Sequence, residues 1–182
     1  MQDLWVFGYG SLMWRPGFEH EERRPALLRG YHRSFCVYSH VHRGTPERPG
    51  LVFGLDAGGS CRGVAFRVEA ARAEETRRYL QAREQVTSVY RDAVKRVELL
   101  DGGGFVEALC FLVDRHHGQY AGRLDFDTQV RLIAEGEGQS GRNPDYLEST
   151  VRHLDEAGVP DEGLSRLWRA VEQRLRQSPV SR

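Results

Sequence analysis

The chain has 182 residues, of which 40% are hydrophobic and 29% are charged, a balance typical of a globular rather than a disordered protein. Its 26 basic and 26 acidic residues cancel to a formal net charge of +0. This neutrality excludes the broad positive surface of a nucleic-acid binder or an anionic-membrane binder. A chain of this length indicates one domain, and we expect residues 1–182 to form it.

The expected strands lie in the first two thirds of the chain, where short apolar runs alternate with glycine-rich turns. They cover residues 4–7, 26–39, 51–55, 63–68, 89–100 and 105–113. We expect a bend at Gly30, a loop over residues 40–50 and a turn at residues 56–60. The last two strands form the clearest hairpin, joined by the turn DGGG at residues 101–104.

Helices are expected once within the strand region, over residues 72–83, and then throughout the last third of the chain. Residues 126–135 form one helix, and a second opens with Asn143 as N-cap and Pro144 at its first position, then closes at Gly158. The third carries an apolar stripe at helical spacing: Leu164, Leu167, Trp168, Val171 and Leu175. The fold class is therefore α+β, a small curved sheet or barrel with the helical part, about residues 126–177, packed on it.

The cysteines and the first residues indicate the cytoplasm. Cys36, Cys61 and Cys110 are odd in number, widely spaced and never CxxC, which predicts neither a disulfide framework nor a zinc site and favours a reducing compartment. Residues 4–7 are only four apolar residues before a glycine, so they predict neither a signal peptide nor a membrane span. No sequence feature indicates an oligomeric state.

The first candidate site is the loop after the first strand, formed by Gly8, Tyr9, Gly10, Ser11 and Leu12. A loop that leaves a strand through glycines exposes backbone N–H groups that can hold an anion or an oxyanion. The loop lacks the third glycine of a dinucleotide fingerprint and the G-x-S-x-G order of a nucleophile elbow, so both of those are rejected. The alternative is a tight turn around a buried tyrosine.

Three other features are weaker evidence for a functional site. Residues 136–141 match GxGxxG but follow a helix, so we interpret them as a helix C-cap and a flexible link that can line a pocket. His116 and His117 are adjacent and have no further ligand cluster, which argues against a metal. Glu84 ends the helix over residues 72–83, where a solvated surface carboxylate is the ordinary interpretation.

Taken together, seven blocks in this order resemble the ChaC family of glutathione-specific γ-glutamylcyclotransferases, and its bacterial branch most closely. The blocks are VFGYGSLMW (6–14), GYHR (30–33), SHVHRGTP (39–46), PG (49–50), GVAFRV (63–68), YLQAREQVT (79–87) with Tyr90, and GQSGRNPDYL (138–147). The resemblance runs over essentially the whole chain, residues 4–171.

The resemblance implies a γ-glutamylcyclotransferase-like fold, a small mixed β-barrel flanked by helices, with no metal and no organic cofactor. It implies a small-molecule partner, glutathione, which is cyclised to release 5-oxoproline and cysteinylglycine. Glu84 matches the catalytic glutamate, and burial is expected to raise its pKa. The loop residues Gly8–Leu12 match the part that holds the glutamyl end, while Tyr90 and Tyr146 match aromatic positions assigned to substrate binding.

Arg43 is a candidate partner for the glycine carboxylate of glutathione, since arginine suits bidentate carboxylate contacts; a salt bridge within its own loop is the alternative. The chain departs from the family at Ser88, where members often have glycine, and at Met13, where they often have isoleucine. These departures affect loop shape more than the reaction.

Two other functions stay open from the sequence. One is a cyclotransferase acting on γ-glutamyl amino acids or amines, and the other is a non-catalytic binding domain of the same fold. Retention of Glu84 with an intact loop argues against the second.

Overall fold

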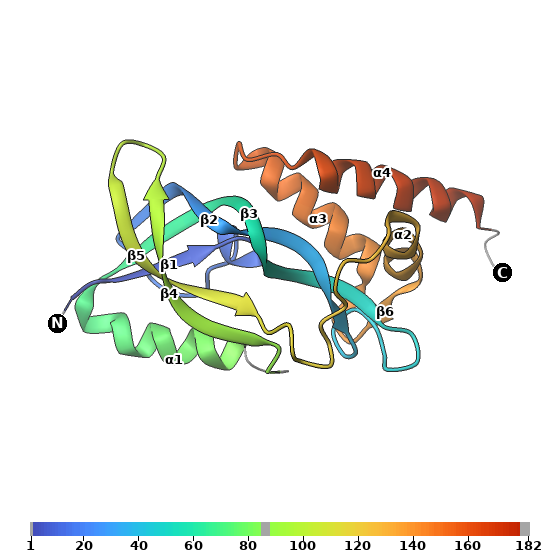
Figure 1. Cartoon of the computed structure of the whole chain (residues 1–182), viewed down its shortest axis with the longest axis horizontal. Helices are drawn as coiled ribbons and strands as arrows, with labels where there is room; N and C mark the ends of the chain where they lie inside the picture. The colour runs from blue at the N-terminus through green and yellow to red at the C-terminus, as the bar shows by residue number, and fades with distance from the viewer. Residues whose placement is uncertain (1, 85–87, 179–182) are drawn as a thin grey trace. The chain divides into compact units, whose positions relative to one another are not determined.

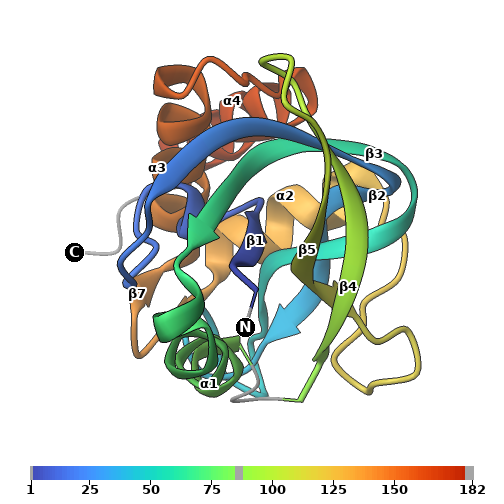
Figure 2. The ribbon, with the colours of Figure 1, turned by 90° about the vertical axis from the view of Figure 1, so that its left-hand side faces the viewer.

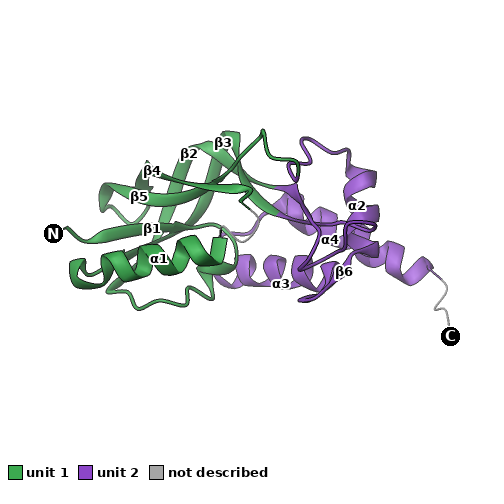
Figure 3. Cartoon of the chain, turned by 90° about the horizontal axis from the view of Figure 1, so that it is seen from below, with its two compact units in different colours: residues 1–34, 53–118 green, residues 35–52, 119–182 purple. Residues whose placement is uncertain are grey.

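The computed structural model describes residues 2–84 and 88–178 (Figure 1). The chain divides into two compact units (Figure 3). Unit 1 comprises Met1–Ser34 and Phe53–Gly118, and unit 2 comprises Phe35–Val52 and Gln119–Arg182. The single domain expected over residues 1–182, with its helical part packed on the barrel, stays a prediction.

Five strands form a closed barrel in the order β1-β3-β2-β4-β5. They are β1 (Leu4–Gly8), β2 (Glu22–Ser39), β3 (Gly50–Val68), β4 (Tyr90–Leu99) and β5 (Gly104–Val113). β1 runs antiparallel to β3, from Leu4↔Val68 to Gly8↔Val64, and parallel to β5 at Trp5↔Ala108. The mixed β-barrel expected from the resemblance is therefore confirmed.

The helix α1 (Ala73–Glu84) follows a single 3-10 turn, η2 (Ala70–Arg72), and lies alongside the barrel in unit 1 (Figures 1 and 2). Its completely buried Leu80 joins an apolar cluster with side chains of β1, β3 and β5. Burying a leucine side chain contributes about 1.5–3 kcal/mol, so Leu80 fixes the second half of α1 against the barrel. Residues four apart share a helix face, and this puts Glu84 on the anchored side of α1.

The turn predicted at residues 56–60 is wrong, because β3 runs through it as one strand. Gly58 and Gly59 have φ of +106° and +66°, a region open to glycine, and they bend the strand without reversing it. The predicted bend at Gly30 is confirmed by its φ of +89°. The β4–β5 hairpin is also confirmed, paired from Tyr90↔Val113 to Leu99↔Gly104.

Unit 2 contains three helices that pack on one another: α2 (Phe126–Glu135), α3 (Asn143–Glu156) and α4 (Glu162–Gln177). All three were expected. Asp125 and Asp161 cap α2 and α4 by accepting from the backbone N–H three residues on, at 2.8 and 3.0 Å. Of the stripe on α4, Leu164, Leu167 and Val171 are buried, whereas Trp168 and Leu175 are half-buried.

Two expectations about the start of α3 need correction. The N-cap is Arg142, and the Asn143 side chain is instead fully buried against Leu51, where its Oδ1 accepts from the backbone N–H at 2.7 Å and its Nδ2 donates to the carbonyl at 2.9 Å. The flexible link is a tight hairpin of β6 (Glu137–Gly138) and β7 (Gly141–Arg142). Within residues 2–84 and 88–178, no helix is long and apolar enough to cross a membrane.

Candidate active site

The loop from Gly8 to Leu12 leaves the end of β1 and enters a 3-10 turn, η1 (Ser11–Met13). A Cβ on Gly8 would lie 3.1 Å from the Leu12 Cβ, so glycine lets the loop fold back closely on its own strand. Tyr9 and Leu12 are buried, and Leu12 belongs to the same apolar cluster as Leu80. The core thus anchors both the loop and the helix that carries Glu84.

Two arginines hold this loop by its polar atoms. Arg33 of β2 donates from Nε to the Tyr9 carbonyl at 2.5 Å and from Nη2 to the Arg62 carbonyl at 2.7 Å. Arg83 of α1 donates from Nη2 to the Ser11 hydroxyl oxygen at 3.0 Å. Sequence reasoning missed both. The available signals were that Arg33 closes the GYHR block and that Arg83 directly precedes Glu84.

The other terminal nitrogen of Arg83 reaches the segment after η1. Nη1 donates to the carbonyls of Arg15 at 2.8 Å and Pro16 at 3.0 Å, and to the Tyr79 hydroxyl at 3.2 Å. One side chain at the end of α1 therefore ties down the segment from Ser11 to Pro16 at three points.

Glu84 is the last residue of α1, and its side chain keeps 18% of its surface exposed. The Arg83 Nε lies 3.7 Å from the Glu84 Oε1, an ion pair longer than a hydrogen bond. Burial raises the pKa of the Glu84 carboxyl, and the Arg83 charge lowers it by a smaller amount. The expected rise is confirmed, and it makes the ionised Glu84 a stronger base than an ordinary surface carboxylate.

Tyr90, at the start of β4, is half-buried against the apolar cluster, and its hydroxyl donates to the Phe53 carbonyl. A phenol has one proton, so a contact with a ligand would use the oxygen as an acceptor or the ring. The Phe53 ring comes within 4.0 Å of where a Cβ on Gly10 would lie. Unit 1 thus brings Tyr90 into contact with Phe53, which in turn lies beside the loop.

Arg43 and Tyr146, the two predicted binding residues of unit 2, lie against each other. The Arg43 guanidinium carbon is 5.2 Å from the centre of the Tyr146 ring, a cation–π contact. Its Nη1 donates to the Arg142 carbonyl at 3.2 Å. Among the described residues Arg43 forms no ion pair, so the salt-bridge alternative for this residue is not what the structure shows.

The backbone around Arg43 is held by the β6–β7 hairpin and by a serine. The Arg43 N–H donates to the Ser39 hydroxyl at 2.9 Å, and the N–H groups of Gln139 and Ser140 donate to the carbonyls of Val41 and His42 at 2.8 and 2.9 Å. A Cβ on Gly138 would lie 2.4 Å from the Val41 carbonyl oxygen. The glycines of the GxGxxG match thus admit a neighbouring backbone.

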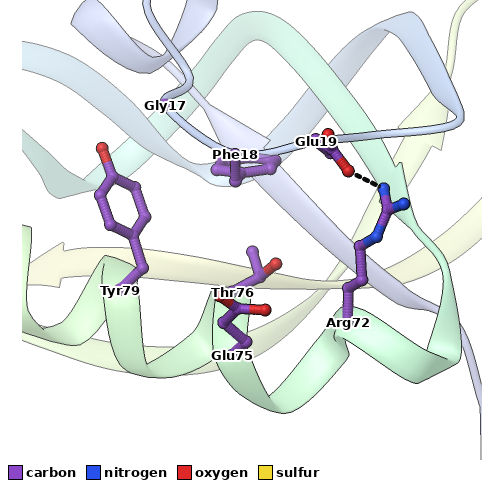
Figure 4. Close-up of a pocket in the computed structure, with 7 residues that line it drawn as sticks. All are labelled: Gly17, Phe18, Glu19, Arg72, Glu75, Thr76 and Tyr79. Carbon is purple, nitrogen blue, oxygen red and sulfur yellow. Dashed lines mark ion pairs between the residues drawn. The ribbon is translucent and has the colours of Figure 1, made fainter.

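A pocket of about 400 Å³ borders α1 on the side of its first turns (Figure 4). It is lined by Gly17, Phe18, Glu19, Arg72, Glu75, Thr76 and Tyr79. No predicted site residue lines this pocket. Its lining residue Tyr79 accepts a hydrogen bond from Arg83, and its lining residue Gly17 directly follows Pro16, whose carbonyl also accepts from Arg83.

Comparison with known proteins bears on the whole chain. A family model described as ChaC-like protein matches residues 4–174. A glutathione-specific γ-glutamylcyclotransferase of Escherichia coli (strain K12) is 35% identical, covering 96% of this chain and 75% of the relative. The human glutathione-specific γ-glutamylcyclotransferase 1 is 32% identical, covering 93% and 79%. The crystal structure of a yeast γ-glutamylcyclotransferase specific to glutathione aligns with a TM-score of 0.87 at 23% identity, over 98% of this chain and all of that one, and so shares the fold.

Proposed function

The chain belongs to the ChaC-like protein family, and on that premise we propose that it is a glutathione-specific γ-glutamylcyclotransferase. Glutathione is cyclised through its γ-glutamyl group and leaves as 5-oxoproline and cysteinylglycine. The observation that carries the proposal is Glu84, a half-buried carboxyl with a raised pKa, fixed at the end of α1 next to an arginine that grips the loop after β1.

The chemistry needs no nucleophile from the protein. The α-amine of the glutamyl group attacks its own γ-carbonyl carbon, a C–N bond closes the five-membered ring, and the C–N bond to the cysteinyl nitrogen breaks. Holding the two groups in this geometry can contribute about 7–11 kcal/mol to lowering the barrier. The demand on the protein is therefore to fold the substrate and to move protons.

We assign the proton transfers to Glu84. The attacking nitrogen starts as an ammonium and ends as a lactam N–H, so it loses two protons. The leaving nitrogen starts as an amide N–H and ends as an ammonium, so it gains two. One carboxylate that accepts from the first nitrogen and donates to the second balances the reaction, and a pKa raised by burial makes it a stronger base for the first transfer.

The loop residues Gly8, Tyr9, Gly10, Ser11 and Leu12 are proposed to supply donors for the glutamyl α-carboxylate and for the developing oxyanion. Ser11 supports this assignment. A guanidinium only donates hydrogen bonds, so the Ser11 oxygen must accept from Arg83, which leaves its own O–H proton for another acceptor.

Arg43 is proposed to bind the glycine carboxylate of glutathione, with Tyr146 supporting its guanidinium, and Tyr90 is proposed to contact the substrate. The support for Arg43 is that one hydrogen bond to a carbonyl uses few of its five N–H donors. We also propose that the protein works in the cytoplasm. Cys36, Cys61 and Cys110 are buried thiols, and burial raises the pKa of Cys110 to about 12, as suits structural cysteines in a reducing compartment.

The test is direct. The purified protein is incubated with glutathione and, separately, with γ-glutamylalanine, and 5-oxoproline is quantified by chromatography. Release from glutathione alone supports the proposal. Release mainly from γ-glutamylalanine would support the cyclisation mechanism but would assign other γ-glutamyl compounds as the substrate. Release from neither, nor from γ-glutamylamines, leaves a non-catalytic binding domain.

Glu84→Gln should lower turnover by about 10²–10⁴-fold, because the amide keeps the shape of the side chain and cannot carry the proton. Glu74→Gln is the matched control, since Glu74 is an exposed carboxylate on the same helix. Normal turnover by Glu84→Gln would contradict the assignment of the base.

A further inference from the structure

We propose that Arg83 is a positioning residue of this reaction: its guanidinium couples the loop after β1 to the carboxylate of Glu84, so that one side chain sets the donor geometry and the charge opposite the base. The proposal rests on the proposed function of the site. No contact between Arg83 and substrate is required.

The first argument is the use of the guanidinium fork. Its two terminal nitrogens are turned toward Ser11 and toward the carbonyls of Arg15 and Pro16, while the third nitrogen, Nε, faces Glu84. The side chain keeps only 21% of its surface exposed. Lysine has a single compact charge and cannot replace such a fork, so the arrangement requires arginine.

The second argument concerns the direction in which Ser11 donates. With Arg83 in place, the Ser11 oxygen accepts and its O–H is aimed elsewhere. Without Arg83, the hydroxyl would be free to rotate, and the loop would lose its ties at Arg15 and Pro16. Misplacing a group by about 1 Å can cost about 10²-fold in rate, so this alone predicts a measurable loss of turnover.

The third argument is the charge around Glu84. Among the described residues, Arg83 is the one charged group that shifts the pKa of the Glu84 carboxyl, and it shifts it downward against burial. On the neighbouring β4, the Asp92 carboxylate accepts from Gln81 at 3.2 Å, and the Tyr90 hydroxyl donates to Phe53. Removing the Arg83 charge should therefore raise the pKa of Glu84 further above its ordinary value.

The close approach of Gly17 to Tyr79 shows that the residues around the Arg83 guanidinium are tightly packed. A Cβ on Gly17 would lie 2.0 Å from the Tyr79 hydroxyl oxygen, and Figure 4 shows the Tyr79 hydroxyl turned toward that glycine. The same hydroxyl accepts from Arg83. Tyr79 thus binds one terminal nitrogen of the guanidinium, Nη1, while Ser11 binds the other, Nη2.

The experiment separates the fork from the charge with Arg83→Lys and Arg83→Gln. The control is Arg78→Gln, an exposed arginine five residues earlier on α1 whose partner is Glu74. For each variant, kcat and kcat/KM for glutathione are measured against pH. Both Arg83 variants should lower kcat on the plateau by about 10–100-fold. The acidic limb of kcat/KM should move to higher pH in Arg83→Gln and stay in place in Arg83→Lys, because only glutamine removes the charge.

A purely structural role predicts a loss of folded protein with the pH limb unmoved, and that outcome overturns the proposal. Equal pH limbs in Arg83→Gln and wild type, or unchanged kcat in Arg83→Lys, also overturn it. If Arg83→Gln does not fold, the kcat of Arg83→Lys still tests the proposal: a lower kcat supports it and an unchanged kcat overturns it.

A readout without turnover keeps this proposal separate from the proposed function. The Glu84 carboxyl is titrated by ¹³C NMR in wild type and Arg83→Gln, with Glu84→Gln to assign the signal. A higher Glu84 pKa in Arg83→Gln supports the coupling even if the wild type releases no 5-oxoproline, an outcome that would remove the proposed function alone. Identical titrations would overturn the coupling even in an active enzyme.

Discussion

Arg83 in unit 1 and Arg43 in unit 2 are arginines used in opposite ways. The terminal nitrogens of Arg83 donate hydrogen bonds to other parts of the protein, namely two carbonyls and two hydroxyls. Arg43 makes one side-chain hydrogen bond, to the Arg142 carbonyl, and rests on the Tyr146 ring. An arginine whose two terminal nitrogens both bind protein acceptors serves to position its neighbours, whereas one that is held by a ring and keeps most of its donors is suited to a ligand.

The two loops are also braced differently. The segment after β1 depends on long arginine side chains that reach it from β2 and α1. The segment around Arg43 depends on backbone partners in the β6–β7 hairpin, on Ser39 and, where it enters β3, on the paired amide of Asn143. Because the β6–β7 hairpin, Ser39 and Asn143 hold this segment, the Arg43 side chain is not needed for that purpose and can bind a ligand.

The largest effect on stability should come from Asn143→Ala, which removes the two hydrogen bonds between the Asn143 amide and the backbone of Leu51 in unit 2. The change strands the buried N–H and carbonyl of Leu51, each of which costs about 1–3 kcal/mol when unpaired. We expect the free energy of unfolding to fall by about 2–4 kcal/mol, measured by urea denaturation. Gln139→Ala is the control, since Gln139 is an exposed amide four residues earlier. A loss below about 0.5 kcal/mol, the range of ordinary surface substitutions, would show that Asn143 does not brace this segment.

Arg43→Ala should raise KM for glutathione by about 10–100-fold, the value of a lost charge-assisted hydrogen bond of about 1.5–3 kcal/mol. KM for γ-glutamyl substrates without a glycine carboxylate should change much less, and kcat and the pH limb should stay in place. Kinetics on glutathione and γ-glutamylalanine measure both. Arg48→Ala is the control, an exposed arginine of the same loop. An equal effect on the two substrates would remove Arg43 from the site and end its contrast with Arg83.

Local patterns predicted most of the fold. The helices α2 and α4 and the β4–β5 hairpin follow from apolar periodicity and turn residues within a dozen positions of one another. The burial of Glu84 did not follow from local patterns, since its place at a helix end favoured a solvated carboxylate and only the family resemblance predicted burial. In the structure Leu80, one helical turn earlier, is buried and fixes this end of α1 against the barrel.

What the sequence did not predict depends on partners far along the chain. Asn143 has the composition of a helix cap, and only the fold reveals that Leu51, 92 positions away, takes its amide. Arg83 and Ser11 are 72 positions apart. The continuity of β3 was missed for a different reason, since Gly58 and Gly59 suit a turn and a bent strand equally well.

The smallest effect is expected at Ser88, where the family resemblance leads us to expect glycine. Ser88 is exposed and has a φ of +58°, the one positive φ of a non-glycine residue in the part of the chain that the structure describes. This left-handed conformation costs an L-residue about 1–2 kcal/mol, and glycine adopts it freely while losing about 0.5–1 kcal/mol of chain entropy. Ser88→Gly should therefore raise the free energy of unfolding by about 0.5–1 kcal/mol, measured by urea denaturation. Ser88→Ala keeps the Cβ and should change nothing, and equal stabilisation by both variants would refute backbone strain as the cause. If Ser88→Gly is more stable than the wild type while the acidic limb of its kcat/KM profile lies at the wild-type pH, the strain at Ser88 acts independently of Arg83 and Glu84.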